Sequence, residues 1–420
     1  MLGAIADDVT GAVDLASNLV SRGFRTQLRF GAPDSPLVAE PPGNIDAIVV
    51  ALKSRTAPAE QAVGESIVSL DALRAAGADR IYVKYCSTFD STPHGNIGPV
   101  CDMVVERMGA RTTVVVPSFP ANGRTLYRGH LFVGDVLLNE SSLAQHPLTP
   151  MTDANIVRVL EAQTDGSVAL VPLDTVRRGA DAVRASLTAL AEHGVRYAVV
   201  DAIDAHDLTT IATATATDAV VTGGSGLALG MTGPSPQAAL AAPDEVRAGP
   251  RVVLAGSASA TTRTQLARAE AAGVPIARLD LESLDASAER AFVSMQDEIS
   301  TNPESMFIVA SPHFDSRTEA TSPEGTSRAA ALESAFAGLA QRFVRIGVRR
   351  FIVAGGETSG AVVEALSTRD LSIGHTIDPG VAWTFASVDL PDGQVPIALA
   401  LKSGNFGGPD FFLDAWRRLA

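Results

Sequence analysis

The chain has 420 residues, which is too many for one ordinary hydrophobic core, so we expect two domains. Hydrophobic residues make up 46% and charged residues 19% of the sequence, a composition typical of globular and not of disordered proteins. The formal net charge of -14 argues against nucleic acid and anionic membranes as partners, because both attract basic surfaces.

Short β-branched segments alternate with alanine-rich helical patterns along the whole chain. In the first half the patterns predict strands at 2–6, 45–52, 80–85, 112–116 and 196–201, and helices at 11–22, 58–76, 153–163 and 179–194. In the second half they predict strands at 305–310, 350–354 and 396–401, and a helix at 327–347. This alternation predicts an α/β fold in which mainly parallel sheets are flanked by helices.

A proline- and glycine-rich stretch, MTGPSPQAALAAPDEVRAGP at residues 231–250, separates two blocks that each repeat the strand and helix rhythm. We therefore expect a first domain at 1–232, a linker at 233–250 and a second domain at 251–420. The expected place of an active site is the cleft between the two domains.

Cysteine content and the N-terminal segment bear on the cellular compartment. Only two cysteines occur, Cys86 and Cys101, so we expect neither a disulfide framework nor a clustered zinc site. The first residues contain no basic segment followed by an apolar run, and no apolar stretch reaches the roughly 20 residues that span a bilayer. We expect a cytoplasmic protein with no membrane partner. The oligomeric state, a homo-oligomer included, stays open.

Lysine is rare in this chain. Of the 33 basic residues only three are lysines, Lys53, Lys84 and Lys402, and all three fall in polar turns. A lysine kept among so many arginines indicates a place that needs a compact ammonium group, although chance survival explains a single one equally well.

The residues that follow each strand are the candidates for chemistry, because open α/β sheets bind ligands beyond the carboxyl ends of their strands. IADDVTGAVD places Asp7 and Asp8 directly after the first predicted strand. Two adjacent carboxylates can hold a magnesium ion or accept a proton from a substrate hydroxyl. The alternative is that Asp8 only caps the following helix.

The segment LKSRT, residues 52–56, offers Lys53 and Arg55 as donors to a small carboxylate. A solvated basic turn is the alternative for this segment taken alone.

Two further loops are rich in polar side chains. KYCSTFDSTPHGNIGP carries Lys84, Ser87, Thr88 and Asp90, and PSFPANGRTLYRGHLF carries Asn122 and Arg124. Loops this polar on a rigid sheet usually carry function, so we expect them to bind a sugar-like ligand with a carboxylate.

The second domain contains three glycine- or serine-rich turns after predicted strands. In FIVAGGETSG, Gly355 and Gly356 let the backbone approach a ligand, and the amides of the following helix suit phosphate. AGSAS at 255–259 repeats this design, and LKSGNFGG at 401–408 adds Lys402, Gly404 and Asn405. Together they predict a nucleotide site built from separate loops, although a plain tight turn is the alternative for each alone. No GxxxxGK[ST] loop occurs.

VTGGSGLALG at 221–230 superficially matches a dinucleotide-binding turn, but it lacks the acidic residue about 20 positions on. We expect a hinge or a turn that lines the cleft.

Taken in order, IADDVTGA, LKSR, KYCSTFDST, GNIGPV, PANGRTLY, GHLFV, HPLTPMTD, VTGGSGLA, FIVAGGETSG and ALKSGNFG resemble the four-carbon acid sugar kinases, and most closely the 3-oxo-tetronate kinases. The resemblance covers essentially the whole chain. It implies an N-terminal domain that binds the acid sugar and a C-terminal domain that binds ATP. The implied reaction phosphorylates the C4 hydroxyl of a 3-oxo-tetronate.

The resemblance also assigns residues to ligands. It places the ATP site at Ser257 or Ser259, Gly355, Gly356, Glu357, Thr358 and Gly404, with Asn405 beside them. It places the acid sugar at Asp8, Arg55, the loop from Ser87 to Asp90, and Arg124. Two departures from the family pattern are Ala258, where cysteine is common, and Ala382, where proline is common.

Phosphoryl transfer needs positioning and charge neutralisation more than covalent chemistry, so helix N-termini, Mg2+ and a lysine suffice. Our hypothesis makes Asp8 the general base or a metal-side carboxylate and has Lys402 neutralise phosphate. The alternatives are a sister kinase for D-threonate, D-erythronate or another short sugar acid, and a non-catalytic binding protein for small acids. A dehydrogenase is disfavoured by the missing fingerprint.

Overall fold

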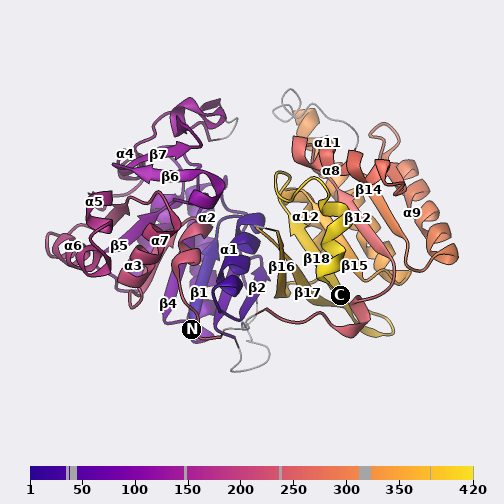
Figure 1. Cartoon of the computed structure of the whole chain (residues 1–420), viewed down its shortest axis with the longest axis horizontal. Coiled ribbons are helices and arrows are strands. Elements are labelled where there is room, and N and C mark those ends of the chain that lie inside the picture. Colours follow the sequence, from indigo (N-terminus) through magenta and orange to yellow (C-terminus); the bar gives the residue numbers. More distant parts are fainter. Residues whose placement is uncertain are drawn as a thin grey trace. The chain divides into compact units, whose positions relative to one another are not determined.

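The computed structural model describes residues 1–34, 37, 45–145, 149–235, 239–311, 323–378 and 380–419. Internal contacts divide the chain into two units, Met1–Ala238 and Ala239–Ala420. Each unit is described by itself (Figure 1). Part of the expected linker, residues 236–238, lies outside the described residues.

The first unit contains a sheet in which every pairing is parallel, in the order β2-β3-β1-β4-β11-β5-β10-β9. Its strands are β1 (Leu2–Ala6), β2 (Thr26–Phe30), β3 (Ala47–Ala51), β4 (Arg80–Lys84), β5 (Thr113–Val116), β9 (Val168–Val171), β10 (Tyr197–Val200) and β11 (Val220–Gly223). Most are short β-branched runs buried on both faces, as parallel strands covered by helices require.

Helices follow most of these strands. They are α1 (Val9–Ser21), α2 (Ala59–Ala75), α3 (Ile97–Arg107), α4 (Ile156–Glu161), α5 (Leu173–Val176), α6 (Ala180–Glu192) and α7 (Ala205–Ala214). A small antiparallel sheet is formed by β6 (Arg124–Tyr127), β7 (His130–Val133) and β8 (Val136–Leu137). The register pairs Ala6 with both Ala51 and Lys84, so three neighbouring strands end at one level.

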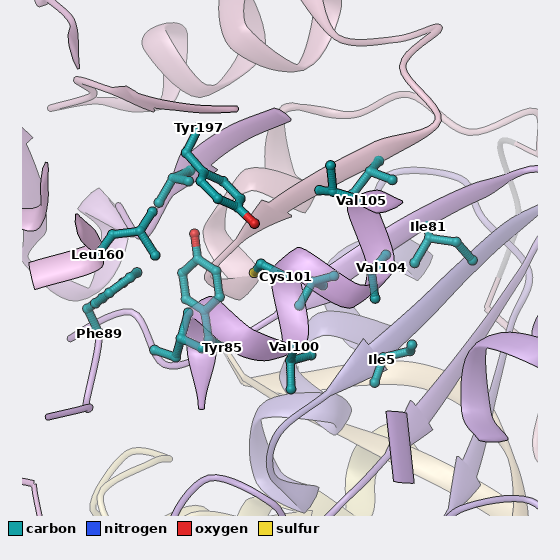
Figure 2. Packing of buried hydrophobic residues seen from close by; sticks show 14 of the residues in the cluster. Ile5, Ile81, Tyr85, Phe89, Val100, Cys101, Val104, Val105, Leu160 and Tyr197 are labelled. Atoms are coloured by element: carbon teal, nitrogen blue, oxygen red, sulfur yellow. The ribbon is translucent and has the colours of Figure 1, made fainter. Parts of the chain in front are cut away.

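Two buried tyrosines in the core of this unit have hydrogen-bonded hydroxyl groups: Tyr85 Oη lies 3.1 Å from Thr222 Oγ1, and Tyr197 Oη donates to Asp102 at 2.6 Å. Figure 2 shows Tyr85, Phe89, Cys101 and Tyr197 in this core. The ring of Tyr85 meets that of Phe89 edge to face at 5.0 Å. Burial raises the pKa of the Cys101 thiol, so this cysteine serves packing.

The second unit is parallel on one side of its sheet and antiparallel on the other. The order is β13-β14-β12-β15-β18-β17-β16, where β18, β17 and β16 form the antiparallel part. The strands are β12 (Arg251–Ala255), β13 (Ile276–Arg278), β14 (Met306–Ala310), β15 (Arg350–Ala354), β16 (Asp370–Asp378), β17 (Val381–Leu390) and β18 (Gly393–Lys402). The helices are α8 (Ala260–Ala271), α9 (Leu284–Thr301), α11 (Pro323–Arg345), α12 (Gly356–Ala365) and α13 (Phe411–Asp414).

The predicted fold class is confirmed: both units contain mainly parallel sheets flanked by helices. Each predicted strand and helix overlaps an observed one, with ends that differ by a few residues. The sequence patterns did not predict the antiparallel strands β16 and β17, whose pairing depends on a hairpin and not on the strand and helix alternation. Among the described residues no helix is both long and apolar enough to cross a membrane.

Candidate functional site

The ends of β1, β3 and β4 are joined by backbone hydrogen bonds. The amide of Asp7 donates to the carbonyl of Lys84 at 3.1 Å. The amides of Ser54 and Arg55 both donate to the carbonyl of Asp7, at 3.0 and 3.1 Å. Three of the segments predicted to carry chemistry, those that follow β1, β3 and β4, therefore meet at one edge of the sheet.

Four of the predicted side chains form an ion cluster at this edge: Asp7, Asp8, Arg55 and Lys84. Arg55 binds Asp7 with two hydrogen bonds of 2.8 and 2.9 Å and reaches Asp8 Oδ1 at 2.5 Å. Lys84 Nζ lies 2.8 Å from Asp8 Oδ1 and 3.4 Å from Asp7 Oδ1. The lysine side chain is only 4% exposed, so its charge is compensated inside the protein and not by water.

Asp8 is held as a carboxylate. Burial alone would raise the pKa of Asp8, but the charges of Lys84 and Arg55, with hydrogen bonds from Lys84 and Thr10, hold it well below its usual range. In the same way, burial would lower the pKa of Lys84, and the two aspartates raise it. Asp8 is therefore held as a carboxylate and Lys84 as an ammonium group at neutral pH.

Asp8 also caps helix α1, so the structural alternative for this residue holds as well. Its side chain accepts hydrogen bonds from the amide of Gly11 at 3.2 Å and from Thr10 Oγ1 at 2.9 Å. A Cβ atom at Gly11 would lie 1.7 Å from Lys84 Nζ and 2.2 Å from Asp8 Oδ1. Gly11 leaves the space in which the ion pair forms.

The polar loop after β4 is anchored by an aromatic side chain. Phe89 is fully buried and has a backbone φ of 51°, a left-handed conformation uncommon for a large residue. Its neighbours Ser87 and Asp90 are half-buried, while Thr88 is buried and lies 2.9 Å from the Cys86 sulfur. Asp90 Oδ1 is buried and has no hydrogen-bond partner among the described residues.

Asn122 and Arg124 lie on a separate loop from the ion cluster. Arg124 starts β6 and donates from its guanidinium to the carbonyl of Asn122. No hydrogen bond or ion pair within the described ranges joins either residue to the cluster, and Arg124 Nε has no partner there. Lys53 is exposed. Their contact with substrate stays a prediction.

Three buried side chains fix the turn that starts VTGGSGLALG. Asp14 accepts a hydrogen bond from Ser225 Oγ, Asn18 Nδ2 donates to the Ser225 carbonyl at 3.1 Å, and Tyr82 donates to the carbonyl of Gly224. These hydrogen bonds fix the turn to α1 and β4, and that it acts as a hinge stays a prediction. That it lines a cleft stays a prediction.

In the second unit, the three turns predicted to bind nucleotide follow strands that lie side by side. The register pairs Ala354 with Ala255 and with Lys402, so β12, β15 and β18 end at one level. The amides of Gly256 and Ser257 donate to the Ala354 carbonyl, each at 2.9 Å, and the amide of Gly355 donates to the Lys402 carbonyl at 2.9 Å. Sequence-distant turns thus meet at one sheet edge.

Helix α12 begins without a side-chain cap. Its N-cap is Gly355, with a φ of 127° that few other residues adopt. Among the residues that the structure describes, no side chain caps the first amides of this helix, so those donors and the helix dipole are available to an anion. Thr358 is buried against Gly256, which leaves its amide rather than its hydroxyl for a ligand, and Glu357 is exposed.

Helix α8 is capped, by Ser259, which also binds the last turn. Ser259 Oγ accepts from the amide of Thr262 at 3.1 Å and lies 2.5 Å from the Gly404 carbonyl. Gly404 lies so close to Ser257 that an added Cβ would be 2.2 Å from its Oγ. Asn405 beside it is exposed.

Lys402 lies below this turn and is fully buried. Its Nζ donates to Thr262 Oγ1 and to the Gly404 carbonyl, each at 3.3 Å. Burial lowers the pKa of Lys402 to about 8. Direct contact between this ammonium and a phosphate stays a prediction that this geometry does not favour.

Two family models match the chain, one in each unit. The Sugar-binding N-terminal domain matches residues 2–231, and the Nucleotide-binding C-terminal domain matches residues 252–412. Proteins named 3-oxo-tetronate kinase from Cupriavidus necator and Burkholderia multivorans are each 48% identical to this chain, over 100% of it and 97% of their own length. The chain belongs to the four-carbon acid sugar kinase family. The crystal structure of Haemophilus influenzae protein HI1011 superposes with a TM-score of 0.81 and 39% identity, covering 100% of both chains.

The ion cluster falls within the match to the sugar-binding domain, and the three glycine- or serine-rich turns fall within the match to the nucleotide-binding domain. The cluster does not fit a resident magnesium ion. Asp7 and Asp8 are already paired with Arg55 and Lys84, and the part of the chain that the structure describes contains no group of three or more potential metal ligands.

Sequence reasoning missed a residue that positions Arg55. Asn96 is buried at the start of α3, and its Nδ2 donates to the carbonyls of Ser54 at 2.7 Å and Ala57 at 3.0 Å. It thereby fixes the loop that carries Arg55. The only signal in the sequence was the unusual GNIGP segment, which does not reveal its partner.

Proposed function

We propose that this protein is an ATP-dependent kinase that phosphorylates the C4 hydroxyl of a 3-oxo-tetronate, 3-dehydro-L-erythronate or 3-dehydro-D-erythronate, in acid sugar catabolism. The product is the 3-oxo-tetronate 4-phosphate. The observation that supports this best is the pairing of two sites in a chain whose relatives carry that name: a carboxylate and cation cluster in the sugar-binding domain, and an uncapped helix with glycine turns in the nucleotide-binding domain.

The triphosphate would lie against the N-terminus of α12. The amides of Gly356, Glu357 and Thr358 point along the helix axis toward an anion there. Ser257 lies beside Gly355 on a neighbouring turn, and Asn405 on the turn after β18 would approach the same phosphates. The missing P-loop lysine is thus replaced by main-chain donors, with Lys402 adding positive charge from beneath.

Asp8 would orient the hydroxyl that attacks the phosphorus atom. Its strongly lowered pKa makes it a weak base, but a loose phosphoryl-transfer transition state needs little proton removal before the new bond forms. An ionised carboxylate that accepts the hydroxyl hydrogen bond suits this role, and Arg55 and Lys84 keep it ionised. As the phosphate ester forms, the hydroxyl proton passes to Asp8 and then to solvent, since the low pKa of Asp8 does not retain it.

Magnesium would arrive with the nucleotide as MgATP. Mg2+ usually keeps several waters and binds nucleotide phosphates through few protein ligands, which agrees with the lack of a preformed site among the described residues. The bound metal ion would neutralise part of the negative charge of the phosphates.

The carboxylate of the sugar acid needs a cation that the cluster does not already use. Arg124, whose Nε lacks a partner among the described residues, is the proposed ligand, with Asn122, Ser87, Thr88, Asp90 and the exposed Lys53 around the same substrate. A shared active site between the two domains remains part of this proposal.

A substrate panel tests the function. The protein would be mixed with MgATP and four-carbon sugar acids, 3-oxidised and not, and ADP release would be measured. We expect turnover only with 3-oxo acids. Turnover with D-threonate or D-erythronate instead would indicate the sister activity, and binding without ADP release would indicate a non-catalytic protein.

Substitution of the proposed catalytic carboxylate tests the mechanism. Asp8→Asn keeps the helix cap and should reduce kcat by at least about a hundredfold, the usual scale of a positioned acid or base. Asp46→Asn removes a different ion-paired carboxylate, bound to Arg25 at 2.8 Å, and should leave kcat unchanged. Full activity of a folded Asp8→Asn variant would defeat the assignment.

A further inference from the structure

One face of α8 is polar although it is buried. Ser259, Thr262 and Gln265 follow one another at intervals of three residues and therefore share a face of the helix. Thr262 and Gln265 are both fully buried. Apolar residues would normally occupy such positions, because a buried polar group costs free energy unless it is hydrogen-bonded.

All three side chains bind backbone carbonyl groups of the loop that follows β18. The Gly404 carbonyl lies 2.5 Å from Ser259 Oγ, 3.0 Å from Thr262 Oγ1 and 3.3 Å from Lys402 Nζ. The loop is thus fixed near its start by two hydroxyl groups and one ammonium group.

Gln265 fixes the other end of the same loop. Its Nε2 lies 3.1 Å from the Phe406 carbonyl and 3.0 Å from those of Gly407 and Gly408. Three carbonyl oxygens around one amide nitrogen require it to be the donor. The opposite atom, Oε1, is buried and has no partner among the described residues. Gln265 therefore binds the loop through Nε2, while its Oε1 stays without a hydrogen bond among the described residues.

Fixing the carbonyl groups also orients the amides of the loop. In a planar trans peptide the C=O and the following N–H point in opposite directions. With the carbonyls of Gly404 and Phe406 turned toward α8, the amides of Asn405 and Gly407 point away from it. Neither amide has a hydrogen-bond partner within the described part of the chain. They lie on the turn beside the N-terminus of α12, whose first amides are also uncapped.

We propose that Thr262 and Gln265 are positioning residues for the nucleotide: they fix the loop at residues 403–408 so that the amides of Asn405 and Gly407 bind the phosphates of ATP and ADP. This inference rests on the proposed kinase function. Neither side chain contacts the nucleotide, and each acts through the loop.

ADP affinity measured by calorimetry tests this role. Gln265→Met keeps the volume and removes the donor, and Thr262→Val does the same for the hydroxyl. Each should raise the Kd of ADP by about tenfold and the KM of MgATP similarly, with the KM of the sugar acid unchanged. Thr262→Ser keeps the hydroxyl group, so this variant should bind ADP with the wild-type Kd.

Gln341→Met is the matched control. Gln341 donates at 2.6 Å to the carbonyl of Ala365, at the far end of α12, so this variant also loses an amide-to-carbonyl bond between elements. It should keep the wild-type Kd for ADP. Circular dichroism and thermal unfolding would establish that each variant is folded at the temperature of the titration.

Unchanged ADP affinity in both Gln265→Met and Thr262→Val, with wild-type protein binding ADP, would overturn the inference and leave the kinase function intact. Absence of ADP binding by the wild-type protein would overturn both. A loss of affinity as large in Gln341→Met would show a general structural effect and would also overturn it.

Discussion

Replacing Gly11 by alanine perturbs the ion cluster without removing any charge. The new Cβ would lie 1.7 Å from Lys84 Nζ and 2.2 Å from Asp8 Oδ1, where ordinary contacts begin at 3.4 Å. Both atoms are ends of side chains, so the backbone need not move, but the 2.8 Å ion pair between them must open. Separating one partner from a buried pair costs about 3–5 kcal/mol, and alanine returns up to about 1 kcal/mol of helix propensity. We expect a net loss of about 2–4 kcal/mol in the free energy of unfolding.

The assay is urea unfolding followed by circular dichroism, combined with kcat for the 3-oxo acid. Gly64→Ala is the control, because Gly64 lies in helix α2 of the same unit and an added Cβ there meets nothing within 4 Å. That variant should be unchanged or more stable by up to about 1 kcal/mol. If Gly11→Ala behaves like Gly64→Ala in both stability and kcat, the space left by Gly11 does not matter to the cluster.

Two pH dependences follow from buried groups. Burial raises the pKa of Asp14 to about 6 from 3.8, so the folded state holds this proton more firmly, and stability falls by about 3 kcal/mol as the pH rises from about 4 to 6. In the Asp14→Asn variant, the free energy of unfolding in urea should no longer fall between about pH 4 and 6. If the variant keeps the wild-type pH profile, Asp14 is not the source of the fall. Burial lowers the pKa of Lys402 to about 8 from 10.5, so its contribution to stability rises as the pH increases between these values. Bound phosphate should raise the pKa of Lys402 again, so ADP binding near about pH 9 should be accompanied by uptake of a proton. This uptake is measured by calorimetry in buffers of different ionisation enthalpy. Lys402→Met should show no uptake, and equal uptake in the variant would contradict the assignment.

The sequence alone was sufficient for the fold class and for placing the candidate site segments at the ends of neighbouring strands. Alternating β-branched and alanine-rich segments can bury their apolar faces only as parallel strands covered by helices. The carboxyl ends of such strands share one edge, so IADD, LKSR and VKYC had to lie close together. The two domain matches bear out the sugar-binding and nucleotide-binding roles assigned to the two halves.

Only the tertiary structure decided what each polar side chain does at those edges. Lys84 and Lys402 look alike in sequence, since each ends a strand before a polar turn. One is paired with two carboxylates, and the other is buried beneath a carbonyl. Their pKa values shift in opposite directions for that reason.

The residues that position the two sites, Asn96 and Gln265, could not be predicted from the sequence either, because their partners are distant along the chain. Asn96 acts on a loop about 40 positions earlier, and Gln265 acts on a loop more than 140 positions later. No sequence pattern identifies which carbonyl a side-chain amide will bind, because every residue has a backbone carbonyl that can accept the hydrogen bond. Local pattern determines which elements form, whereas the partner of a buried polar group is determined by how those elements pack.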